Sequence, residues 1–249
     1  MPNRIMCRSS IAAVAAVAAS LIALAAPAIS EAQGDTVASA CRTTEGNSIP
    51  VIERNATGSA PLTLMLTGDG GWANADQKVA EGLVARGSAV VGVNMRSYLG
   101  KRRSPDEAAR DMACLASAYL AAWHRDHLLV LGYSRGADIA PFVVARWPAE
   151  LRQRVTMVAL VSMSTRANFQ FHFIDLVRDV VRTDDLEVAP ELQRLRGLNV
   201  ICVSGEDDHD SGCSVADTTI VKRYSRAGGH RITGGFSAIA DLLVPSLMR

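Results

Sequence analysis

The fold is decided by one stretch of the sequence, Leu128-Leu129-Val130-Leu131-Gly132-Tyr133-Ser134-Arg135-Gly136. An apolar run typical of a buried strand leads into Gly-x-Ser-x-Gly, and a helical pattern then continues to about Trp147, before Pro148. In this motif the glycines permit a sharp strand-to-helix turn that holds the serine hydroxyl above the sheet. The stretch therefore predicts that Ser134 is a nucleophile. A glycine-rich turn without chemistry is the alternative.

Other apolar runs alternate with helical patterns on both sides of this motif. Strands are expected at 51–52, 62–67, 89–93, 128–131, 155–161, 200–203 and 219–224. Helices are expected at 76–86, from Ser104 onward, at 134–147 and at 236–248, with Pro245 ending or kinking the last one. Near-continuous apolar strands alternating with helices predict an α/β fold, with a mostly parallel sheet covered by helices on both faces. No repeat or linker divides the chain, so residues 33–249 are expected to form a single domain.

A serine nucleophile needs a base to remove its proton. In hydrolases with this turn the order along the chain is serine, acid, histidine, which excludes His124 and His127. His230 is the predicted base, because it follows Gly228-Gly229 between the last predicted strand and the last predicted helix.

The acid is expected after the penultimate strand, in the loop Gly205-Glu206-Asp207-Asp208-His209-Asp210-Ser211-Gly212-Cys213. Asp208 is the predicted acid, Asp210 is the first alternative, and Asp207 is the second. The loop lacks the spacing of a calcium-binding EF-hand, and no cysteine pair has the short spacing of a zinc site. We therefore expect no metal and no cofactor.

A second glycine-rich loop follows an early strand. It reads Gly68-Asp69-Gly70-Gly71-Trp72, and glycines let backbone N–H groups approach a ligand oxygen. The amide of Asp69 or Gly70, together with that of Arg135, is predicted to form the oxyanion hole. No Gly-Lys-Ser/Thr follows, which excludes a phosphate-binding P-loop; a purely structural turn remains the alternative.

Composition and the N-terminal residues bear on the compartment. The chain has 249 residues with 26 Lys and Arg against 25 Asp and Glu, which argues against a nucleic-acid binder held by bulk charge. Arg4 and Arg8 precede an apolar run at 11–26, and small residues follow. This pattern is typical of a secretory signal peptide, here predicted at 1–32. An uncleaved membrane anchor is the alternative.

Export would place the cysteines in an oxidising compartment. Without Cys7 four remain, Cys41, Cys114, Cys202 and Cys213, and they allow three pairings. Cys202 and Cys213 bracket the acidic loop, so this pair is the predicted disulfide. Buried free thiols are the alternative.

Taken together, these motifs resemble the VirJ/AcvB family of bacterial virulence-associated proteins, exported members of the α/β-hydrolase superfamily. The resemblance runs from Leu62 to the C-terminus and departs from the family pattern at Arg231 and Arg135. The residues that carry it are Leu66-Thr67-Gly68-Asp69-Gly70-Gly71-Trp72, Tyr98, Arg103-Ser104-Pro105, Gly132-Tyr133-Ser134-Arg135-Gly136-Ala137-Asp138, Gly205, Asp208, Asp210, Ser211, Cys213 and Gly228-Gly229-His230.

The resemblance implies a periplasmic enzyme that removes the lysyl or alanyl group from aminoacylated phosphatidylglycerol at the membrane surface. For such a substrate, Trp72 and Tyr98 are candidate pocket walls, although buried packing is the plainer interpretation of both. Asp138, or Asp69, is a candidate acceptor for the substrate's ammonium group, and Asp138 could instead be structural. Arg103, with Lys101 and Arg102, is a candidate contact with anionic lipid; a solvated loop is the alternative.

Two other functions remain open. One is a non-catalytic periplasmic adaptor whose partners are components of a secretion system. The other is a generic secreted esterase or peptidase acting on soluble substrates. An adaptor needs no ordered serine, acid and histidine, and that argument favours an enzyme.

Overall fold

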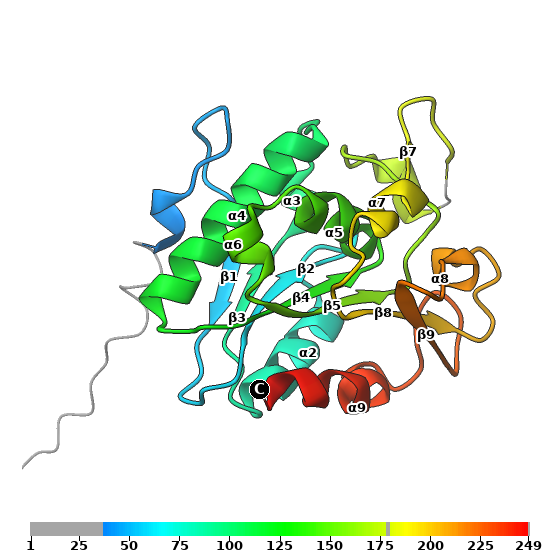
Figure 1. Cartoon of the computed structure of the whole chain (residues 1–249). Coiled ribbons are helices and arrows are strands. Elements are labelled where there is room, and N and C mark those ends of the chain that lie inside the picture. Colours follow the sequence, from blue (N-terminus) through cyan, green and yellow to red (C-terminus); the bar gives the residue numbers. More distant parts are fainter. Residues whose placement is uncertain (1–36, 178–179, 249) are drawn as a thin grey trace, which may run out of the picture.

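One seven-stranded sheet organises the molecule. The computed structural model describes residues 37–177 and 180–248, so the predicted signal peptide lies outside the described residues. The strands lie in the order β1-β3-β2-β4-β5-β8-β9, as Figure 1 shows. Only β1 runs antiparallel to its neighbour, and all other pairs are parallel. The strands span Val51–Arg54 (β1), Leu62–Leu66 (β2), Val90–Val93 (β3), Leu128–Tyr133 (β4), Val155–Val161 (β5), Val200–Gly205 (β8) and Val221–Arg226 (β9).

The central strands are buried on both faces, which explains why their sequences are continuously apolar. Successive side chains of a strand point to opposite faces. In β4, Leu128 and Val130 belong to one apolar cluster, whereas Leu129 and Leu131 belong to the other. The sheet therefore separates two cores, each closed by its own helices.

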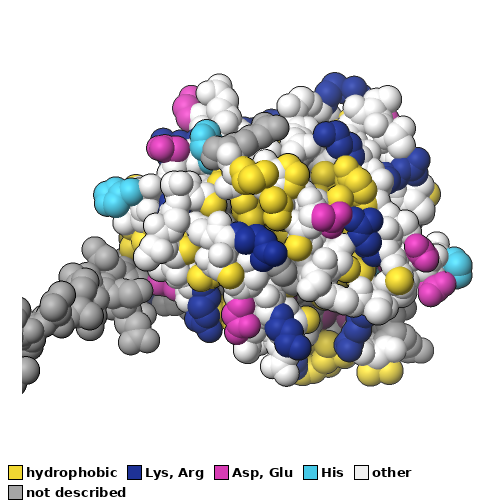
Figure 2. Space-filling view, turned by 90° about the horizontal axis from the view of Figure 1, so that it is seen from below, with side chains coloured by type: hydrophobic (Ala, Val, Ile, Leu, Met, Phe, Trp, Pro, Cys, Tyr) yellow, Lys and Arg dark blue, Asp and Glu magenta, His cyan; other side chains and the backbone are white. Residues whose placement is uncertain are grey.

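Helices cover each core. On one face lie α4 (Pro105–Ala122) and α5 (Arg135–Ala145), and on the other lie α2 (Asn74–Val84) and α9 (Phe236–Leu247). Figure 2 views the face of α2 and α9, where patches of apolar side chains lie among charged ones. A cap of the predicted kind starts α4, because the Ser104 hydroxyl accepts from the Glu107 N–H and the Glu107 carboxylate accepts from the Ser104 N–H. The predicted arrangement, a mostly parallel sheet with helices on both faces, is confirmed.

Two features sharpen or change the sequence-based expectation. First, α9 continues past Pro245 to Leu247, which agrees with the expected extent of the helix and excludes the alternative that the proline ends it. In the last turn a missing N–H removes only one hydrogen bond, and the buried Leu243 and Leu247 keep this turn packed.

Second, an insertion that we had not predicted separates β5 from β8. The insertion, residues 162–199, holds a two-stranded sheet, a 3-10 helix and a short α-helix. Its elements are β6 (Arg166–Ala167), η1 (Phe173–Leu176), β7 (Leu186–Glu187) and α7 (Ala189–Gln193); the remaining short helices are α3 (Met95–Tyr98), α6 (Ala149–Arg152) and α8 (Gly212–Val215).

Two disulfides close loops of the fold. The predicted Cys202–Cys213 pair is present, and Cys41–Cys114 joins the segment before β1 to α4. Within the described residues, no helix combines the length and the apolar character that crossing a bilayer requires.

Candidate active site

The turn around Ser134 is built by close backbone packing. Ser134 has φ 51° and ψ −121°, a conformation that a non-glycine residue rarely adopts and that occurs at strained functional turns. A Cβ on Gly132 would lie 2.6 Å from the Ala137 Cα, and one on Gly136 would lie 2.0 Å from the Leu66 carbonyl oxygen. No side chain fits at either glycine, so the chain can turn sharply from β4 into α5.

The loop between β9 and α9 brings His230 to this serine. The Ser134 Oγ lies 2.9 Å from the His230 Nε2, which is hydrogen-bond distance. The two residues are 96 positions apart in the sequence. The structure thus places together the nucleophile and the base that the sequence predicts, with the nitrogen positioned to take the hydroxyl proton.

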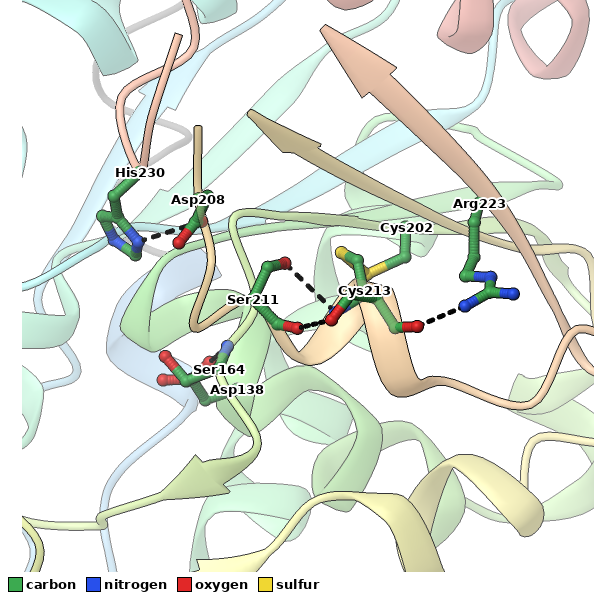
Figure 3. Close-up of a disulfide and its surroundings, with 9 residues drawn as sticks. Asp138, Ser164, Cys202, Asp208, Ser211, Cys213, Arg223 and His230 are labelled. Atoms are coloured by element: carbon green, nitrogen blue, oxygen red, sulfur yellow. Dashed lines mark hydrogen bonds and ion pairs between the residues drawn. A yellow bond between two sulfur atoms is a disulfide. The ribbon is translucent and has the colours of Figure 1, made fainter. Parts of the chain in front are cut away.

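Asp208 lies on the other side of the imidazole. Its Oδ2 is 3.6 Å from the His230 Nδ1, a contact that Figure 3 marks with a dashed line. This distance is longer than a hydrogen bond, and that oxygen is buried without a hydrogen-bond partner among the described residues. Asp207 and Asp210 are exposed. Of the three candidate acids, Asp208 is therefore the one that the structure places against the imidazole.

Backbone contacts join the loop of Asp208 to the loop of His230. A Cβ on Gly205 would lie 2.1 Å from the Gly229 carbonyl oxygen, so only glycine allows the two loops to approach this closely. The Asp207 N–H donates to the Gly228 carbonyl at 3.0 Å. The separation of the acid and the base is therefore set by the main chain rather than by long side chains.

The other end of the acidic loop is held by the disulfide and by Asp138. The Gly212 N–H donates to the Met163 carbonyl at 2.7 Å, and Asp138 accepts from the Ser164 N–H at 2.6 Å, as Figure 3 shows for the latter pair. Asp138 is buried. Its position supports the structural alternative, because the carboxylate fixes the backbone on which the acidic loop rests.

The glycine-rich loop after β2 passes directly beside the serine. A Cβ on Gly68 would lie 3.1 Å from the Ser134 Cβ. Within residues 37–177 and 180–248, the backbone amides of Asp69, Gly70 and Arg135 have no hydrogen-bond acceptor. Unpaired amides beside a nucleophile are the donors that an oxyanion hole needs.

The sequence of the chain matches that of a known protein family. The sequence model described as bacterial virulence protein (VirJ) matches residues 60–249. The chain belongs to the VirJ family. A comparison with curated protein sequences finds no significant match.

Solved structures show which fold this VirJ family member shares. An esterase from Pyrococcus furiosus is 12% identical, with a TM-score of 0.62 over 84% of this chain and 89% of that one. The esterase domain of a Rhodothermus marinus protein is 13% identical (TM-score 0.55, 82% and 93% covered). Est1E from Butyrivibrio proteoclasticus, solved with ferulic acid, is 14% identical (TM-score 0.54, 81% and 96% covered). The shared fold is the α/β-hydrolase fold, as the sequence predicted.

In this VirJ family member the residue after Ser134, Arg135, has its side chain in a charged cluster. The guanidinium donates to Asp69 at 3.0 Å and to Asp175 of η1 at 2.9 Å. Burial by itself would lower the pKa of Arg135, but the hydrogen bond with Asp69 and the charges of Asp69, Asp138 and Asp175 together outweigh it and raise the pKa. Arg182 donates to the other oxygen of Asp175 at 2.5 Å. Arg135 thus joins the glycine-rich loop after β2 to the insertion. The Asp69 carboxylate is therefore already paired with a cation of the protein.

Sequence reasoning did not identify Asp175 or Arg182. The one available signal was a lone carboxylate inside the apolar run Phe171-His172-Phe173-Ile174-Asp175-Leu176-Val177. A carboxylate in such a run is buried only when it is paired, but the sequence does not show that its partner is Arg135.

Of the other predicted substrate contacts, Tyr98 and Arg103 are buried and Trp72 is partly buried. The Tyr98 hydroxyl donates to Asp111 at 2.7 Å, and burial, together with the Asp111 charge, raises the pKa of Tyr98. Arg103 is buried with its guanidinium over the Tyr98 ring. The Trp72 indole lies against Gly92 of β3, where a Cβ would be 2.2 Å from the ring. All three agree with the packing alternative, and none is placed beside Ser134 by a described contact.

The remaining basic residues near Arg103 have acidic partners. Lys101 pairs with Glu45 at 3.1 Å, and Arg102 pairs with Asp184 at 2.6 Å. In the part of the chain that the structure describes, no group of three or more His, Cys, Asp or Glu side chains is arranged to hold a metal ion.

Proposed function

We propose that this protein is a serine hydrolase with Ser134 as nucleophile, His230 as base and Asp208 as acid. The observation that carries the proposal is the 2.9 Å contact between the Ser134 Oγ and the His230 Nε2, made at a turn whose strained φ holds the hydroxyl above the sheet. A binding protein needs neither the strained serine nor the histidine.

The first half of the reaction acylates the serine. His230 takes the Ser134 proton as the oxygen attacks an ester carbonyl, and the amides of Asp69 or Gly70 and of Arg135 bind the oxyanion. The protonated imidazole then gives its proton to the departing alcohol oxygen, and an acyl-serine ester remains. In the second half His230 takes a proton from a water molecule as the water oxygen attacks the acyl-serine carbonyl. The bond between that carbonyl carbon and the Ser134 Oγ then breaks, the imidazolium returns its proton to Oγ, and the acid is released.

Asp208 would stabilise the imidazolium and hold its tautomer. Catalytic hydrogen bonds of this kind tighten in the complex with substrate, so the 3.6 Å separation from the His230 Nδ1 is compatible with this role. Because the carboxylate oxygen is buried and has no hydrogen-bond partner, closing this gap would also relieve an unsatisfied polar group.

For the substrate we propose an aminoacylated phosphatidylglycerol, lysyl or alanyl, as the family resemblance implies. The alcohol released would then be phosphatidylglycerol. Two disulfides suit an oxidising compartment and so support the periplasm as the place of action.

The decisive experiment compares the parent protein with Ser134→Ala, and with Ser225→Ala as a control for loss of an exposed serine on β9. On aminoacyl-phosphatidylglycerol in liposomes we expect Ser134→Ala to lose activity by roughly 10³-fold or more and Ser225→Ala to retain it. A parent protein that hydrolyses only short p-nitrophenyl esters would be a generic esterase. A Ser134→Ala protein that still supports secretion in cells would instead be a non-catalytic adaptor.

A further inference from the structure

The insertion carries an exposed apolar surface. Among the described residues, eight large apolar side chains are exposed, and six of them lie between positions 173 and 186. Phe173 is 74% exposed, Val177 83% and Val181 72%; the other three are Ile174, Leu176 and Leu186. Single exposed apolar residues are ordinary, but a cluster of this kind marks an interaction site. We call these six residues the apolar patch.

An ion pair joins the two main parts of the patch. Asp175, in the middle of η1, pairs with Arg182 at 2.5 Å, which brings the segment of Val181 beside the turn that carries Phe173. The Asp175 side chain is only 3% exposed, so the charged residue of η1 faces inward and its apolar neighbours face outward. In Figure 1 the yellow-green segment of the insertion projects beyond the sheet near β7.

The patch is anchored beside the proposed nucleophile. Asp175 also accepts from Arg135, the residue immediately after Ser134. A partner bound at the patch would therefore lie at the rim of the proposed active site, rather than on a remote face of the molecule.

A cation borders the patch. The Arg96 guanidinium of α3 lies 5.2 Å from the centre of the Phe171 ring and 5.7 Å from that of Phe173. An arginine at the edge of exposed aromatic and aliphatic side chains suits the boundary of a bilayer, because the apolar groups enter the acyl region while the cation meets lipid phosphates.

We propose that the apolar patch, with Arg96 at its border, docks the protein on an anionic bilayer surface and presents lipid headgroups to Ser134. This inference rests on the proposed function, because a substrate that is itself a lipid must leave its acyl chains in the bilayer while its headgroup ester reaches the serine. Aliphatic and aromatic side chains with a cation at their border fit a lipid surface, whose outer layer is charged and whose interior is not.

The test compares three forms of the full mature chain. They are the parent, Phe173→Ser with Val177→Ser, and a control, Val215→Ser with Met248→Ser, which removes two side chains that are 71% and 77% exposed but lie outside the patch. Binding is measured by co-sedimentation with vesicles of phosphatidylglycerol and phosphatidylcholine in equal parts. We expect the patch variant to bind at least about tenfold more weakly, the scale of losing buried apolar side chains, and the control to bind like the parent.

A second arm separates charge from apolar contact. Arg96→Gln is expected to weaken binding to the mixed vesicles and to leave binding to pure phosphatidylcholine vesicles unchanged. The proposal is overturned if the patch variant binds vesicles like the parent or if the control loses binding equally. It is also overturned if the patch variant changes only self-association in sedimentation velocity, since the patch would then bind a second copy of the chain.

Turnover of p-nitrophenyl acetate keeps this test separate from the proposed function. We expect the patch variant to hydrolyse this soluble ester like the parent, which also shows that the variant is folded. If the parent does not hydrolyse any ester but binds vesicles through the patch, the hydrolase proposal fails and the docking proposal stands. If hydrolysis of soluble and lipid esters survives in the patch variant, the docking proposal alone fails.

Discussion

Two regions at the same edge of the sheet are held in place by different means. The loops of the proposed active site, which carry Ser134, Asp208 and His230, are fixed by main-chain contacts; Gly136 and Gly205 pack against carbonyl oxygens so closely that no side chain fits. The outer part of the insertion, around η1, is tied down by charged side chains, through the pairs of Asp175 with Arg135 and with Arg182, whereas its base is packed into the core by residues such as Phe169 and Leu192.

This difference has consequences for both function and sequence. Main-chain packing fixes atoms to within a fraction of an ångström, which proton transfer requires. Ion pairs between long side chains tolerate exchange and movement, which suits a segment that meets a variable surface. Main-chain packing also requires glycine at fixed spacings, and this requirement can be recognised as a motif in the sequence. An ion pair between residues far apart in the sequence produces no such motif.

The largest expected effect concerns the acid. Asp208→Asn should lower the kcat for ester hydrolysis by roughly 10³- to 10⁴-fold, because an amide cannot stabilise the imidazolium or hold its tautomer. Asp210→Asn is the matched control, since Asp210 is on the same loop and is exposed; its kcat should change less than about threefold. Steady-state kinetics on a soluble ester measure both. A larger loss from Asp210→Asn would transfer the role to that residue and show that the loop moves on binding.

The sequence was informative wherever local chemistry forced the structure. The Gly-x-Ser-x-Gly turn after an apolar strand predicted where Ser134 lies, and the order of motifs identified His230, which the structure places 2.9 Å away. The Cys202–Cys213 disulfide was also predictable, because the two cysteines bracket a single short loop. In each case the constraint acts within a few residues or follows from the order of parallel strands.

The insertion was not predictable for the converse reason. Its strands have two residues each, too short for any periodicity to show, and its position depends on contacts such as that between Arg135 and Asp175, 40 residues apart. The burial of Tyr98 and Arg103 could not be predicted for the same reason, because a hydrogen bond between a tyrosine and an aspartate follows no fixed spacing in the sequence.

A smaller effect is expected where the acid and base loops touch. Gly205→Ala would place a Cβ 2.1 Å from the Gly229 carbonyl oxygen, so one loop must move away and carry its catalytic group with it. We expect the kcat for a soluble ester to fall by about 10- to 100-fold, with a loss of about 1–3 kcal/mol in the free energy of unfolding. Gly229→Ala is the control, because its Cβ would meet no atom within 4 Å. Similar kinetics in the two variants would mean that main-chain packing does not set the geometry of the site.

The smallest effect on catalysis is expected from Asp175→Asn. This variant also tests most directly whether the insertion and the loops of the proposed active site are held in place independently. Arg135 and Arg182 would lose a shared buried carboxylate, and removing one partner of a buried ion pair costs about 3–5 kcal/mol in the free energy of unfolding. We expect the lower end of this range, because Asp69 still pairs with Arg135, and a change in soluble-ester kcat of no more than about threefold. Asp184→Asn is the control: it removes an ion pair with the exposed Arg102, and exposed pairs of this kind contribute little to stability.

Urea unfolding gives the two stabilities, and hydrogen exchange shows where the change lies. With Asp175→Asn, amides of the described part of the insertion should exchange faster, while those of α5 behind Ser134 keep their protection, because Gly136 and Leu66 still pack there. If the amides of α5 also exchanged faster, α5 and the insertion would unfold as one cooperative unit. Arg135 would then support the position of Ser134, and the proposed difference between a rigid active-site region and an adaptable docking surface would be wrong.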